Sequence, residues 1–256
     1  MFHIVVCIKS VVTGVSKGQM RRTSENSQLN PFDRPALEAA LQIRAKTQGT
    51  VTAVSMGPRI SIEALTETLA MGVDRAILVS DPALKESDTR VTAGVLATAI
   101  KRLGPFDLLI FGTRTADSDT GQVGPQTSVV LDIPYVSRVT DIDAHGQEWT
   151  IERRMDDWTE TWRVAMPMAM SIDPHAFVPR SVCLGGISQA FEQPAIESLT
   201  LQDLGLSEAV VGLNGSPTRV ARLEKIKHDR HCNMLPGDPQ TQVRALFEHL
   251  NKAGIL

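Results

Sequence analysis

Cysteine and aromatic residues are scarce in this chain of 256 residues, and long apolar runs are missing. The three cysteines, Cys7, Cys183 and Cys232, are too few and too scattered for a disulfide framework, which favours a reducing cytoplasm. No stretch reaches the roughly 18 apolar residues of a membrane helix, and the N-terminus lacks the pattern of a signal peptide. The net charge of −3 disfavours a general nucleic-acid binder. We therefore expect a cytoplasmic protein with neither a membrane span nor a nucleic-acid partner.

Two kinds of hydrophobic pattern alternate in the first half of the chain. Four short, nearly continuous apolar runs are typical of strands buried on both faces, as in a parallel sheet. These runs cover residues 2–8, 50–56, 75–80 and 106–111. Between them, apolar residues recur at helical spacing, and Asp33 is the expected cap of the first helix. The order predicts a doubly wound α/β domain with a mainly parallel sheet.

The pattern changes after Pro134. Residues 149–155 and 158–166 predict an antiparallel hairpin, and residues 168–172 return the chain to the main sheet. From Asp173 onward, proline and glycine interrupt an irregular sequence.

An extended C-terminal arm is therefore expected, with a last strand at 218–227 and a final helix over 239–252 that Asp238 caps. The apolar stripe of this helix packs either on its own domain or on a partner subunit. We expect a nucleotide-binding domain at 1–178 and an arm at 179–256.

A glycine-rich segment from Gly112 to Thr127 follows the fourth predicted strand and leads into a short predicted helix at 125–131. Ligands of open α/β sheets bind beyond the carboxyl ends of the strands. Gly121 and Gly124 allow the backbone to approach a ligand, and amides at the helix start suit a phosphate or pyrophosphate. The added side-chain donors are Thr120, Gln122, Gln126 and Thr127. The alternative is a glycine-rich turn that only caps a helix.

The sequence gives little support for other nucleotide-binding motifs, for a metal site or for catalytic residues. The nucleotide-binding patterns G-x-G-x-x-G and G-x-x-x-x-G-K-[ST] are both missing, which disfavours a standard dinucleotide dehydrogenase and a P-loop NTPase. The cluster at 228–232 matches no zinc pattern, and no catalytic Ser/His/Asp or Cys/His pairing is visible. Asp117 and Asp119 orient backbone more plausibly than they act as an acid–base pair. We expect neither a catalytic residue nor a metal site.

Six segments occur in order at compatible spacing and together resemble the small (beta) subunit of the electron transfer flavoproteins. They are Val6–Lys9, Asn30–Asp33 with Ala36–Glu38, Val54–Pro58, Ala70–Ala76, Asp119–Pro125 and Gly215–Thr218. The resemblance covers almost the whole chain. It implies a Rossmann-like fold of the adenine-nucleotide-hydrolase type and a heterodimer with an alpha subunit that holds FAD.

The resemblance also implies that this subunit binds an adenine nucleotide, and that Phe32 lies beside the flavin of the alpha subunit. The implied cofactor contacts are Cys7, Lys9, Asn30, Pro31, Phe32, Asp33, Met56, Gly112, Asp119, Thr120, Gly121, Gln122, Val123, Gly124, Pro125, Gln126 and Thr127. Residues 180–187 resemble the family's recognition loop, in which Leu184 would dock on an acyl-CoA dehydrogenase or another dehydrogenase.

The nucleotide itself is FAD or AMP. Val123-Gly124-Pro125 follows the version of the motif that resembles electron-bifurcating members, which hold a second FAD in this subunit, whereas Gly121 departs from that version. The bifurcating interpretation implies NADH as electron donor and ferredoxin or flavodoxin among the acceptors. The alternatives are a single-electron shuttle that contains AMP, and an adenine-nucleotide-binding module without redox function.

Overall fold

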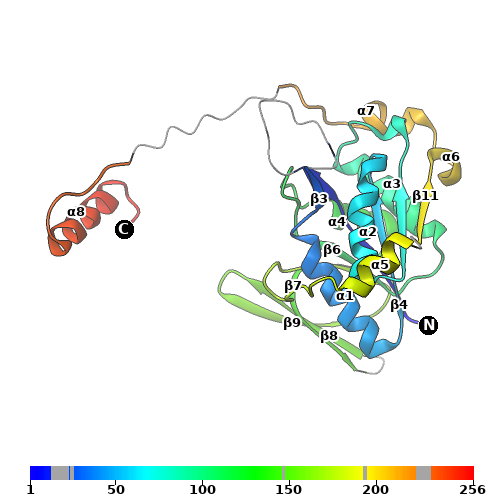
Figure 1. Cartoon of the computed structure of the whole chain (residues 1–256), viewed down its shortest axis with the longest axis horizontal. Coiled ribbons are helices and arrows are strands. Elements are labelled where there is room, and N and C mark those ends of the chain that lie inside the picture. Colours follow the sequence, from blue (N-terminus) through cyan, green and yellow to red (C-terminus); the bar gives the residue numbers. More distant parts are fainter. Residues whose placement is uncertain (13–22, 24–25, 146–147, 193–194, 223–231) are drawn as a thin grey trace. The chain divides into compact units, whose positions relative to one another are not determined.

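The computed structural model describes residues 1–12, 23, 26–145, 148–192, 195–222 and 232–256 (Figure 1). Its contacts divide the chain into two units, Met1–Val220 and Ala221–Leu256, which we describe separately. Within the described residues, we find no helix with the length and apolar character needed to cross a bilayer.

The first unit is built on a twisted central sheet whose strand order is β11-β5-β4-β1-β6-β10-β7-β8-β9. The strands from β11 to β7 run parallel, and β7, β8 and β9 pair antiparallel. The strand bounds are β1 (His3–Cys7), β4 (Thr50–Met56), β5 (Arg75–Val79), β6 (Leu108–Gly112), β7 (Tyr135–His145), β8 (Glu148–Met155), β9 (Trp158–Val164), β10 (Met168–Ile172) and β11 (Ile196–Leu199). This arrangement confirms the predicted mainly parallel α/β sheet with an added hairpin.

Helices cover both faces of the sheet because alternate strand residues point to opposite sides. In β1, Ile4 and Val6 join the core that contains α1, whereas Val5 and Cys7 join the core that contains α3. The helix bounds are α1 (Asp33–Thr47), α2 (Ile62–Met71), α3 (Thr89–Arg102), α4 (Val123–Leu131), α5 (Leu184–Glu192), α6 (Leu201–Leu204), α7 (Gly212–Gly215) and α8 (Pro239–Lys252), with short 3-10 turns at Arg59–Ser61, Pro82–Leu84 and Glu208–Val210.

The long polar segment between β1 and α1 begins and ends in a small antiparallel pair, β2 (Ser10–Val12) with β3 (Ser27–Leu29). This pairing sets Ser10 opposite Leu29, and the amide of Asn30 donates to the carbonyl of Lys9 at 2.9 Å. The pair therefore brings the start of α1 back to the carboxyl end of β1.

Three local predictions differ from the structure. Asp33 is not the cap of α1: Phe32 holds that position, and the buried Asp33 carboxylate bonds to other segments. Helix α4 begins at Val123, two residues before the predicted start. Residues 218–222 form no strand, and the rest of the strand predicted there lies outside the described residues.

Residues 179–220 belong to the first unit by their contacts. Helix α5 packs on α2, and β11 extends the sheet beside β5. Two consecutive glycines, Gly185 and Gly186, oppose helix formation in α5. Packing overrides this preference, because a Cβ atom at Gly186 would lie 2.3 Å from the carbonyl oxygen of Ala70 at the end of α2.

The second unit contains α8, as predicted over 239–252. The Asp238 side chain caps this helix by accepting hydrogen bonds from the amides of Gln240 and Thr241. The apolar residues Val243, Leu246 and Phe247 are exposed. An amphipathic helix with an exposed apolar stripe is suited to packing on another surface.

Candidate functional site

The carboxyl ends of β1, β4 and β6 lie side by side in the sheet, with β1 in the middle. The chain leaves β1 toward β4 and β5, and after α3 it crosses to β6 on the other side of β1. This reversal between β1 and β6 is where open α/β sheets bind ligands. Cys7, Met56 and Gly112 are the last residues of these three strands.

A buried amide and a buried carboxylate join the segments that meet there. Asn30 is fully buried, and its Nδ2 donates to Asp33 Oδ1 at 2.8 Å and to the carbonyl of Arg114 at 2.9 Å. Its Oδ1 accepts from the amide of Ala116 at 3.2 Å. Asp33 Oδ2 accepts from the amide of Lys9 at 2.7 Å. This cluster therefore connects the end of β1, the start of α1 and the loop after β6.

Gly112 lets α1 and β6 approach at this point. A Cβ atom at Gly112 would lie 2.3 Å from Asp33 Oδ1 and 2.6 Å from the carbonyl oxygen of Phe32, well inside van der Waals contact. Only glycine fits here without a shift of the backbone of α1.

An ion pair holds the next part of the same loop. Lys9 Nζ donates to Asp117 Oδ1 at 2.7 Å and to Ser118 Oγ at 3.2 Å. Partial burial raises the pKa of Asp117, but the hydrogen bond and charge of Lys9 outweigh burial, so that its pKa is lowered overall. Asp117 thus positions the loop as a carboxylate.

Arg114 lies on the outer side of the loop. Its guanidinium carbon is 4.7 Å from the centre of the Phe32 ring, within the range of a cation–π interaction. An Nη atom of the same guanidinium is 3.3 Å from an Asp119 carboxylate oxygen. The Phe32 ring is half-buried under this cation, and Pro31 beside it is exposed.

The residues from Asp119 to Gln122 are exposed, and Asp119 and Gly121 have left-handed backbone angles, with φ of 53° and 61°. Helix α4 follows at once, and the first amides of a helix have no acceptor within it. Gly124 lies against Tyr135 and Phe111, so it serves packing. Thr127 is buried, and its hydroxyl donates to the Val123 carbonyl.

The Asp33 carboxyl has an unusual environment. Burial raises its pKa to about 7, against the hydrogen bonds from the Lys9 amide and the Asn30 side chain, which lower it. Burial also raises the pKa of the Cys7 thiol far above its ordinary value, and the neighbouring Asp33 adds to this effect. Cys7 is therefore a packed core thiol rather than a reactive one.

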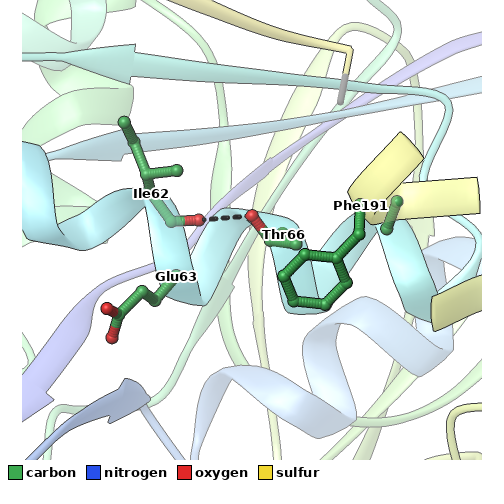
Figure 2. Close-up of a pocket in the computed structure, with 5 residues that line it drawn as sticks. Ile62, Glu63, Thr66 and Phe191 are labelled. Atoms are coloured by element: carbon green, nitrogen blue, oxygen red, sulfur yellow. Dashed lines mark hydrogen bonds between the residues drawn. The ribbon is translucent and has the colours of Figure 1, made fainter. Parts of the chain in front are cut away.

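A second exposed region lies on α5. Leu184, the first residue of this helix, is 86% exposed, and Phe191 is also exposed. A pocket between α5 and α2 is lined by Ile62, Glu63, Thr66, Ala190 and Phe191 (Figure 2). The segment before α5 is tied to α1 by an ion pair between Arg180 and the buried Glu38.

Three of these interactions are not predicted by the sequence: Lys9 with Asp117, Arg114 with Phe32, and Arg180 with Glu38. Lys9, Phe32, Asp117 and Glu38 each stand in segments that the sequence motifs single out, but spacing does not show which residues of distant segments pair. In the described parts of the chain, no three His, Cys, Asp or Glu side chains gather as a metal site would require. His228 and His231 lie outside the described residues.

Comparison with known proteins gives consistent matches. A family model described as the electron transfer flavoprotein domain matches residues 18–204. The chain is 36% identical to the electron transfer flavoprotein subunit beta of Thermoanaerobacterium thermosaccharolyticum, over 99% of this chain and 100% of that protein. It is 41% identical to the caffeyl-CoA reductase-Etf complex subunit CarD of Acetobacterium woodii, over 86% of each chain. FixA of Azotobacter vinelandii is 34% identical, over 86% of this chain and 83% of that protein.

The close approach at Gly112 predicts a large effect of a single methyl group. Gly112→Ala should lower the free energy of unfolding by at least about 2 kcal/mol, because the added Cβ collides with backbone and carboxylate. Gly94→Ala is the matched control: a Cβ there meets nothing within 4 Å, and removing a helical glycine stabilises by up to about 1 kcal/mol. Denaturant unfolding measures both, and equal stabilities of the two variants would contradict the packing described.

The raised pKa of Asp33 predicts a pH dependence with a definite sign. The folded chain binds the Asp33 proton more tightly than the unfolded chain does, so the contribution of this proton to stability is lost as pH rises from about 4 to about 7. Asp33→Asn removes the titration. Guanidinium unfolding between pH 5 and pH 8 should show a stability loss in the natural chain that the variant lacks. Parallel pH profiles of the two proteins would contradict this assignment.

Proposed function

The chain belongs to the electron transfer flavoprotein family as a beta subunit, and we propose that it binds FAD at the carboxyl ends of β1, β4 and β6. One observation carries this proposal. The glycine-rich loop after β6 and the start of α1 are held together by Asn30 at the point where the strand order reverses.

The residues present fit a nucleotide. The exposed loop at 119–122 has no side chain at Gly121 to keep a ligand away, and the amides at the start of α4 are suited to a diphosphate. Gln126 Oε1 is buried without a hydrogen-bond partner among the described residues, which leaves an acceptor for a ligand donor. Because Asn30 and Asp33 use their side-chain groups within the protein, they would position the loop rather than hold the nucleotide directly.

A bound flavin would supply the redox chemistry, since it exchanges electrons one or two at a time. The residues of this chain would position the flavin and determine the charge around it. Lys9 is paired with Asp117, and the charge of Arg114 lies against Phe32 and Asp119. We propose no catalytic residue in this subunit.

The proposal extends to partners. We propose that the chain forms a heterodimer with an FAD-containing alpha subunit, on which the exposed apolar face of α8 packs. We further propose that Leu184 docks on an acyl-CoA dehydrogenase, because a highly exposed leucine at the start of a helix suits a small, transient redox interface. A second FAD would allow electron bifurcation from NADH, with ferredoxin or flavodoxin as one acceptor.

The nucleotide content of the purified heterodimer tests the central point. We expect two FAD per heterodimer after denaturation and chromatographic quantification. Gly121→Val should release one of them, because valine rarely adopts a φ of 61° and its Cβ would lie 3.0 Å from the Thr113 carbonyl oxygen. Gly94→Ala, in α3, is the control and should keep both.

The same measurement can contradict the proposal in two ways. One FAD with one AMP would make the protein a single-electron shuttle and overturn the second flavin. One FAD with no second nucleotide would overturn nucleotide binding by this subunit altogether.

A further inference from the structure

An ion pair between Arg180 and Glu38 ties the segment before α5 to α1. Arg180 donates from its backbone amide and from Nε to Glu38 Oε2, at 3.1 and 2.8 Å, and from a terminal nitrogen to Oε1 at 3.1 Å. Gln42, one turn further along α1, donates to the same Oε1 at 3.0 Å. Every oxygen of the Glu38 carboxylate therefore has a donor.

Glu38 lies on the buried side of α1, and only 5% of it is exposed. A carboxylate is unfavourable in such a place unless it is paired and hydrogen-bonded. The planar guanidinium of Arg180 donates to both carboxylate oxygens of Glu38. This bidentate contact fixes the orientation of the Arg180 side chain as well as its distance from Glu38. Burial raises the pKa of Glu38, but the bonds from Arg180 outweigh burial and lower it, so the pair stays charged.

The ion pair lies four residues before Leu184 in the sequence. Helix α5 is also held by α2, because Gly186 approaches the Ala70 carbonyl. The buried Ala190 lines the pocket between the two helices, together with Ile62 and Thr66, which Figure 2 shows. Leu184 itself is 86% exposed. The exposed leucine thus stands on a segment that is fixed before and after it.

The geometry points to Arg180 and Glu38 as positioning residues, which hold Leu184 in the position from which it docks on an acyl-CoA dehydrogenase. This inference rests on the proposed docking role of Leu184. A small transient interface gains little binding energy, so ordering a loose segment during docking would weaken it. The ion pair between Arg180 and Glu38 avoids this loss of affinity, because it orders the segment before the partner binds.

The test uses the flavin-loaded heterodimer as electron acceptor for an acyl-CoA dehydrogenase supplied with its acyl-CoA substrate. Arg180→Gln should raise the KM for the heterodimer by roughly three- to tenfold, the scale of ordering an interface segment, with kcat unchanged. Arg180→Lys keeps the charge but loses the bidentate contact of the guanidinium with Glu38. Its KM should therefore lie between those of the natural chain and of Arg180→Gln. Arg44→Gln is the matched control, because Arg44 also joins α1 to a carboxylate, Asp74, at 2.9 Å.

Hydrogen exchange of the same heterodimers separates positioning from general stability. Exchange of the amides at 181–187 should accelerate at least threefold in Arg180→Gln and stay unchanged in Arg44→Gln. A fall in melting temperature with unchanged KM would overturn the inference and leave a purely structural ion pair.

Leu184→Ala separates the docking role of Leu184 from the positioning role of Arg180. If Leu184→Ala raises KM and Arg180→Gln does not, the docking role stands and the positioning role is wrong. If Leu184→Ala leaves KM unchanged, docking at this leucine is wrong, and the positioning role falls with it. Nucleotide binding by this subunit does not depend on either result.

Discussion

The hydrogen bond between the buried Asn30 amide and the Asp33 carboxylate is the interaction on which the site depends. Both residues are buried, and together they join the end of β1, the first turn of α1 and the loop after β6. Buried polar groups of this kind fix one arrangement, because every alternative leaves a donor or acceptor unpaired. The arrangement also requires glycine at position 112, where a side chain would collide with Asp33.

Helix α1 consequently supports two surfaces. Its first turn holds the loop proposed to carry the nucleotide, and its second turn carries Glu38, which holds the segment before Leu184 through Arg180. Glu38 follows Asp33 by five residues. At about 1.5 Å of rise per residue, both side chains therefore lie within the first two turns of the helix. One helix thus joins the loop proposed to bind the nucleotide and the segment proposed to dock to the same part of the sheet.

Hydrophobic patterns in the sequence predicted the strands at 50–56 and 168–172, the hairpin and α8, because the spacing of apolar residues differs between strands and helices. The fine geometry could not be predicted. Asp33 has the residue type of a helix cap, and only tertiary contacts turn it inward. Helix α5 contains two glycines that disfavour a helix, and its contact with α2 is invisible in its own sequence. The pairs formed by Lys9 and by Arg180 join residues distant in sequence, which spacing cannot reveal.

The most direct test is the nucleotide content of the heterodimer carrying Asn30→Leu, which keeps the branched shape of the side chain but removes its hydrogen bonds to Asp33, Arg114 and Ala116. The account predicts that the folded heterodimer keeps the FAD of the alpha subunit and loses the nucleotide of this subunit. A folded variant with both nucleotides at full occupancy would contradict the claim that the Asn30–Asp33 cluster builds the site.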